Sequence, residues 1–165
     1  MTFSESLLPE FDQEMASTRR VLARVPDDKP DWKPHPKSFS IAHLAQLLAS
    51  MSGWVGQVIT HTELDLKSGG LGYSNQKTKS LLETFDENVK TSRAAIVNAK
   101  DGDYDVDWSL KMGPQVLMTM PRRTVVRQHM SHLSHHRGQM TVYLRLLNIP
   151  VPSIYGPTAD EGWGG

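Results

Sequence analysis

Four segments of the chain place apolar residues at intervals of three and four, which is the spacing of an amphipathic helix. They cover about residues 6–25, 40–60, 81–99 and 121–148, and Ser40 and Pro121 are residue types typical of a helix start. Each segment has one apolar face that has to be buried against another element. The pattern therefore predicts four helices that pack against one another.

The segments between these helices contain residues that do not continue a helix. Residues 26–37 hold four prolines and predict an extended connector, while the composition of residues 67–76 indicates a loop. Residues 104–121 alternate apolar and polar types around Gly113 and Pro114, so they fit either a short hairpin or an extended crossover.

The tail after Asn148 is too rich in proline and glycine for regular structure. With four helices and no convincing strand pairs, we expect an all-α fold, a four-helix bundle with a long crossover connection. A short hairpin before the last helix is left open. Residues 1–165 are expected to form a single domain, because the length is that of one typical domain.

The composition limits which partners, location and metal ligands we expect. Eighteen basic residues balance eighteen acidic ones, so we expect no nucleic-acid partner. No apolar run approaches the roughly 20 residues of a spanning helix, and the amino terminus lacks the features of a secretory signal. We therefore expect no membrane partner and a cytoplasmic location. Because the chain has no cysteine, any metal must be bound by imidazole or oxygen.

Four of the seven histidines fall within eight residues of the last predicted helix: His129, His132, His135 and His136. At about 100° per residue, His129, His132 and His136 share one face, which we expect to be the core face, and His135 points away from it. His132 and His136 lie on consecutive turns, so both imidazoles can reach one divalent ion. Alternatively, they are core histidines with satisfied hydrogen bonds.

The neighbours of this pair are also informative. His129, one turn earlier, is expected to line a pocket rather than to complete a three-ligand site, because three successive turns exceed one coordination sphere. Arg137 and Gln139 either orient a histidine or bind an anionic group, or else make ordinary polar contacts between helices. Gly138, in the helix interior, predicts close approach of another helix.

Two stretches resemble the DinB/YfiT-like family, whose members are regarded as metalloenzymes. "SHLSHHRGQMTVYLRLLNIPVPSIYGPTADE" is similar to its carboxy-terminal signature, and "DWKPHPKSFSIAHLAQLLASMSGWV" is similar to the early one. The resemblance implies a four-helix bundle with a long crossover that commonly forms a homodimer. It also implies a divalent ion such as zinc or nickel, held by one histidine of helix two and two of the last helix.

Residue by residue, the last-helix ligands match His132 and His136, whereas the helix-two position falls on Leu47. Leucine has no ligating atom, and His43, four residues earlier, is the candidate replacement. Three outcomes are open: a rearranged site with His43, a two-histidine site completed by water or another side chain, and a site without metal.

Two functions follow from the resemblance. The first is a metal-dependent enzyme, a hydrolase or a thiol-dependent transferase, with Arg137, Tyr143 and Tyr155 as substrate-binding residues and no residue assigned to catalysis. Its partner would be a small-molecule substrate or thiol. Alternatively, Tyr143 and Tyr155 only anchor the core and the tail. The second is a metal-free bundle that acts as a binding or stress-response interaction protein.

Overall fold

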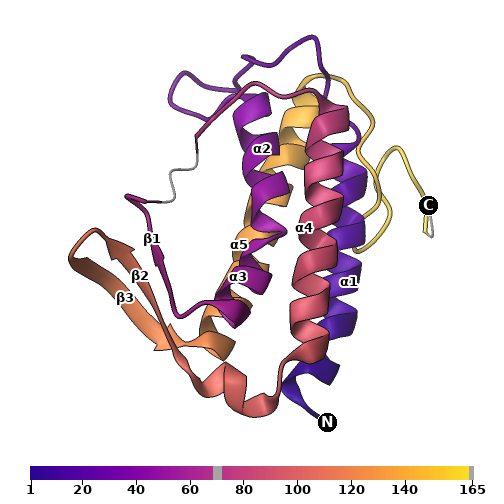
Figure 1. Cartoon of the computed structure of the whole chain (residues 1–165). Helices are drawn as coiled ribbons and strands as arrows, with labels where there is room; N and C mark the ends of the chain where they lie inside the picture. The colour runs from indigo at the N-terminus through magenta and orange to yellow at the C-terminus, as the bar shows by residue number, and fades with distance from the viewer. Residues whose placement is uncertain (69–71, 164–165) are drawn as a thin grey trace.

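The computed structural model describes residues 1–68 and 72–163, which form a helical bundle with a small sheet at its side (Figure 1). The helices are α1 (Phe3–Leu22), α2 (Ile41–Met51), α3 (Trp54–Thr60), α4 (Thr78–Asn98), the 3-10 helix η1 (Asp101–Asp105) and α5 (Arg122–Leu146). The strands are β1 (Glu63–Asp65), β2 (Asp107–Met112) and β3 (Gln115–Pro121). Because α2 and α3 follow one another along the bundle, the five α-helices of the described residues fill four bundle positions.

The starts of α1 and α2 are set by residues that satisfy free backbone N–H groups of the first turn. Thr2 accepts a hydrogen bond from the Glu5 N–H while the Glu5 side chain accepts from the Thr2 N–H, so α1 begins earlier than expected. Ser40 accepts from the His43 N–H, which confirms it as an N-cap. Pro121 precedes the first residue of α5.

The single helix expected over residues 40–60 is wrong, because α2 ends at Met51 and α3 begins at Trp54. Helix α4 supplies the reason. The Asn88 side chain donates to the Ala49 carbonyl at 3.0 Å, and the Ser92 hydroxyl donates to the Ser52 carbonyl at 2.8 Å. These side chains satisfy carbonyls at the end of α2, so the helix breaks without leaving them unpaired.

The all-α prediction is also wrong, because the chain forms a three-stranded mixed sheet in the order β1-β2-β3. Strands β2 and β3 form the hairpin left open by the sequence, with Gly113 at φ 60° in its turn. Strand β1 pairs parallel to β2, with Glu63 opposite Ser109. A three-residue strand whose partner lies more than forty residues away has no local signature. Of the expected loop 67–76, residues 69–71 lie outside the described residues.

One apolar core runs through the bundle, and the proline-rich connector and the sheet pack onto it. Trp32 anchors the proline-rich connector edge-on against Tyr143, with ring centroids 5.5 Å apart. The inner face of the sheet adds Trp108, which is buried, and Leu110, which is partly buried. In the described part of the chain, no helix combines the length and apolar character that crossing a bilayer requires.

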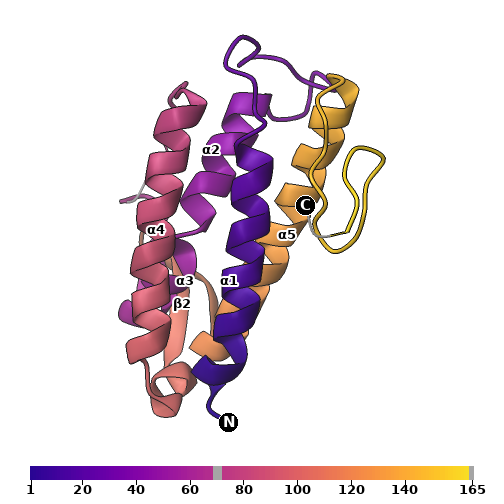
Figure 2. The ribbon, with the colours of Figure 1, turned by 90° about the vertical axis from the view of Figure 1, so that its right-hand side faces the viewer.

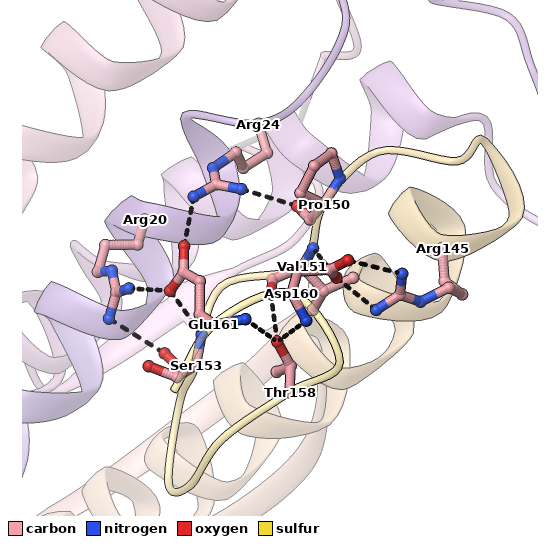
Figure 3. Close-up of polar contacts among 9 residues, drawn as sticks. All are labelled: Arg20, Arg24, Arg145, Pro150, Val151, Ser153, Thr158, Asp160 and Glu161. Atoms are coloured by element: carbon pink, nitrogen blue, oxygen red, sulfur yellow. Dashed lines mark hydrogen bonds and ion pairs between the residues drawn. The ribbon is translucent and has the colours of Figure 1, made fainter. Parts of the chain in front are cut away.

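The tail after Asn148 lies against α1 and α5, on the side of the bundle away from the sheet (Figures 1 and 2). Glu161 accepts hydrogen bonds from Arg20 and Arg24 of α1, and Asp160 accepts from Arg145 of α5 (Figure 3). As predicted, the described tail contains no helix or strand. Charged contacts to two helices fix its course instead.

Two glycines provide a matched test of helix packing. A Cβ at Gly56 would lie 2.9 Å from the Ser92 Cα, so α3 and α4 approach too closely for alanine. A Cβ at Gly138 would meet no heavy atom of the described residues within 4 Å, leaving aside its own helix backbone. The close helix approach expected at Gly138 is therefore wrong, and Gly56 makes such a contact instead.

We expect Gly56→Ala to lower the free energy of unfolding by about 1–3 kcal/mol, because backbone atoms must move apart. Gly138→Ala should raise it by up to about 1 kcal/mol, since alanine restricts the unfolded chain and clashes with nothing. Urea unfolding of both variants and the wild type measures the effects. Equal shifts in the same direction would contradict this account of α3–α4 packing.

Candidate metal-binding histidine pair beside an apolar pocket

His132 and His136 point their rings at one another from consecutive turns of α5. Their Nε2 atoms lie 2.9 Å apart, and the ring centroids lie 4.7 Å apart. His135 contacts the edge of this pair, with its ring centroid 5.0 Å from that of His136. The spacing of four residues on a helix thus brings two nitrogen atoms to a common point.

Gln139 determines which nitrogen of His136 bears the hydrogen. Its side-chain oxygen lies 2.7 Å from the His136 Nδ1, so Nδ1–H donates and the Nε2 of His136 carries a lone pair. His132 then donates from its Nε2–H to that lone pair. Such an outer hydrogen bond is the usual means of orienting a histidine ligand. The pair shares one hydrogen at the place where an ion would bind.

The geometry fits two ligands of a divalent ion. Two nitrogens held at about 2.1 Å from zinc are about 3.0 Å apart at a right angle and about 3.4 Å apart at the tetrahedral angle. The observed 2.9 Å is close to the first value. Among residues 1–68 and 72–163, however, no three histidine, aspartate or glutamate side chains gather where they could hold an ion. The described side chains therefore supply two of the ligands that a divalent ion needs.

The two helix-two residues singled out by the sequence do not join the pair. His43 lies between aromatic rings, with centroids 4.3 Å from Phe39 and 4.9 Å from Tyr73. Leu47 is partly buried and packs against the core. It lies one helical turn before Ser50, which lines the same pocket as His132.

Arg137 defines the core face of α5, which differs from the expected one. Its side chain is 2% exposed and pairs with Glu14 of α1 at 2.6 Å. The buried face therefore contains Met130, Leu133, Arg137 and Met140, and the histidines lie on its flank. The prediction that three histidines face the core is wrong, because the arginine is buried through a partner distant in sequence.

The hydroxyls of the two tyrosines named by the sequence have partners within the protein. The Tyr155 hydroxyl accepts from Arg137 and donates to Glu14 at 2.9 Å, which ties the tail to α1 and α5. The Tyr143 hydroxyl donates to the Phe39 carbonyl at 3.2 Å. Glu14 was missed by the sequence reasoning, although an acidic residue between Phe11 and Thr18 on the apolar face of α1 was the available signal.

A cavity of about 540 Å³ lies between the helices and the inner face of the sheet, and His132 forms part of its wall. The side chains that line it are Ser50, Trp54, Gln57, Val58, Leu64, Leu66, Asn88, Trp108, Leu110, Met118, His129 and His132. The row of Leu64, Leu110 and Met118 runs across all three strands in register. Because the strand β1 was not expected, the sequence reasoning missed this wall.

The pocket environment favours neutral histidines. Burial lowers the pKa of His129 to about 4, and the neighbouring His132 adds to the effect. Burial also lowers the pKa of His132, with repulsion from His136 and His135 as further causes. His129 contacts Trp54 and Trp108 edge-on, with centroid distances of 5.3 and 6.4 Å.

These features define a class: a helical-bundle protein with a paired-histidine site on its last helix and an apolar pocket beside it. The model of the DinB family matches residues 1–163, and the chain belongs to that family. The uncharacterized protein YrdA of Bacillus subtilis (strain 168) is 45% identical over 158 residues, which cover 95% of this chain and 90% of YrdA.

Two solved structures have the same fold. The crystal structure of the DinB-like protein YjoA from Bacillus subtilis has a TM-score of 0.72 at 17% identity and covers 90% of this chain and 97% of that one. A DinB-like protein from Bacillus cereus ATCC 10987 also has a TM-score of 0.72, at 20% identity, covering 92% and 97%. At these identities the likeness concerns the fold alone.

The buried pair of Arg137 and Glu14 leads to a stability prediction. We expect Arg137→Met to cost about 3–5 kcal/mol, because it leaves the Glu14 carboxylate buried without its partner. The double variant Arg137→Met with Glu14→Leu should recover much of that loss. Urea unfolding provides the double-mutant cycle, with Arg93→Met in the exposed Arg93–Asp12 pair as a control of little effect. Additive effects of the two changes would contradict the coupling.

The low pKa of His129 predicts loss of stability in acid. Between pH 6.5 and about 4 the unfolded chain binds a proton that the folded chain does not, so stability falls as the pH falls. The loss amounts to at most about 3 kcal/mol. Unfolding at pH 7 and pH 4.5 measures it. His129→Gln should weaken this pH dependence, whereas His35→Gln in the exposed connector should leave it unchanged.

Proposed function

We propose that this chain is a divalent-metal-dependent enzyme, a hydrolase or thiol-dependent transferase, whose site is built on His132 and His136. The supporting observation is the 2.9 Å separation of their Nε2 atoms, together with the Gln139 hydrogen bond that places the lone pair of His136 on its Nε2, toward His132. When bound, a divalent ion such as zinc or nickel lowers the pKa of a coordinated water or thiol and so generates a nucleophile.

The neighbouring side chains orient the two histidine rings. Gln139 fixes the ring of His136, and Trp54 lies against His132 with ring centroids 5.8 Å apart. With Leu47 at the position that the resemblance gives to the third ligand, two histidines would bind an ion weakly, and water or a group of the substrate would complete its coordination. The site is therefore expected to bind metal more tightly when its substrate is present.

The other residues named from the sequence have weaker support. The guanidinium of Arg137 and the Tyr155 hydroxyl bind Glu14, and the Tyr143 hydroxyl binds a backbone carbonyl. Their substrate-binding roles stay predictions, as does a ligand role for His43. The contacts favour structural roles for Arg137, Tyr155 and Tyr143, and aromatic packing for His43.

The second candidate is a metal-free bundle that binds a small molecule or takes part in a stress-response interaction. It is supported by the absence of any three-ligand cluster among the described residues. The homodimer and the cytoplasmic location are likewise predictions. Metal binding separates the two candidates.

We expect zinc or nickel to raise the thermal midpoint of protein purified without chelator, and His132→Ala or His136→Ala to abolish the rise. His135→Ala and His43→Ala should retain it, because neither ring lies at the shared point. Leu47→His should tighten zinc binding about tenfold or more by adding a third ligand, whereas the matched Leu47→Gln should not. Calorimetry and elemental analysis measure the affinity and the bound metal.

Two results would favour the metal-free protein. One is less than about a tenth of an equivalent of bound metal together with no change in the thermal midpoint on adding zinc. A metal that binds the folded state stabilises it and would raise that midpoint. The other is equal zinc affinity for Leu47→His and Leu47→Gln. Weaker binding in His43→Ala would instead establish the rearranged site.

A further inference from the structure

We infer that the site acts on an uncharged, largely apolar molecule whose body fills the cavity behind His132 while its polar end reaches the histidine pair. The inference deepens the proposed function by naming a substrate class, and it rests on that function for the reaction. The binding of the apolar body, however, depends only on the cavity, so it can be tested without any metal.

The first argument is the wall of the cavity. Its apolar side chains come from the sheet and from α3, with two indoles, Trp54 and Trp108, among them. None of the described residues that line it is aspartate, glutamate, lysine or arginine. An ionised group inside would lose its water without gaining a countercharge, which is costly. The wall therefore selects against charged molecules.

The second argument is the position of the opening. His132 lines the cavity and is also exposed to solvent, so one exposed edge of the cavity carries a member of the histidine pair. Its neighbour His129 lies deeper, where burial is greater. A ligand that enters here places its inner end among apolar groups and its outer end at the two Nε2 atoms.

The third argument is size. The volume of about 540 Å³ lies within the range of roughly 300–1,000 Å³ that small-molecule sites occupy. Two kinds of side chain line the cavity. Trp54 and Trp108 contribute flat aromatic rings, and the row of Leu64, Leu110 and Met118 contributes flexible apolar side chains. Such a lining suits a flat body of one or two rings.

Two fluorescent probes with the same ring skeleton test the charge selection. N-phenyl-1-naphthylamine is uncharged, and 8-anilinonaphthalene-1-sulfonate differs from it by one sulfonate. We expect the uncharged probe to bind saturably, one molecule per chain, with a Kd at least about tenfold lower than that of the sulfonate. The titrations are done with chelator present, so failure of metal binding does not affect the result.

Variants of the sheet locate the probe. Leu110→Asp puts a charge into the cavity wall and should weaken binding of the uncharged probe about tenfold or more. The matched Val116→Asp, on the same hairpin but 53% exposed, should leave it unchanged. Should Leu110→Asp fail to fold, Leu110→Trp reduces the cavity while keeping it apolar and should also weaken binding.

Three results would overturn the inference: no saturable binding of the uncharged probe, equal affinity for both probes, or equal effects of the Leu110 and Val116 variants. If metal binds but the probes do not discriminate, the proposed function survives and the substrate class is wrong. If the probes discriminate but no metal binds, the cavity belongs to a metal-free binding protein of the same ligand class.

Discussion

The buried ion pair between Arg137 and Glu14 determines how the last helix faces the bundle. A guanidinium that is 2% exposed requires a carboxylate partner, and Glu14 on α1 supplies it at 2.6 Å. Tyr155 completes the contact from the tail. One interaction thus joins α1, α5 and the tail, and it fixes the rotation of α5 about its own axis.

That rotation explains the environment of every histidine on α5. At about 100° per residue, His129 lies about 80° from Arg137, His136 about 100° and His132 about 140°, all on the same side of the helix. His135 lies about 160° away and is exposed. The order accounts for the greater burial of His129 and for a histidine pair on the flank of the core, from which His132 reaches the pocket beside the sheet.

Local signals in the sequence predicted what local forces determine. Ser40 and Pro121 marked helix starts, and the spacing of His132 and His136 predicted that their nitrogens meet. What escaped prediction depends on contacts between distant residues. Strand β1 exists because residues Glu63–Asp65 pair with residues more than forty positions later. Helix α2 ends where the side chains of Asn88 and Ser92 of α4 donate hydrogen bonds to carbonyls at its end. The environment of His43 likewise depends on Tyr73, thirty positions away.

The fold and the proposed metal site are separable in this chain. Leu47 packs against the core, so the residue that the family resemblance aligns with a third ligand contributes apolar burial to the bundle. Three of the four ring nitrogens of the pair have partners through the shared hydrogen and Gln139, and His132 is exposed to solvent, so the described bundle needs no ion to avoid buried unpaired polar atoms there. Small zinc domains that unfold without metal have no such alternative. Because these contacts hold the bundle without an ion, a sequence change at the histidine pair would alter the proposed metal affinity while leaving the apolar pocket beside it in place.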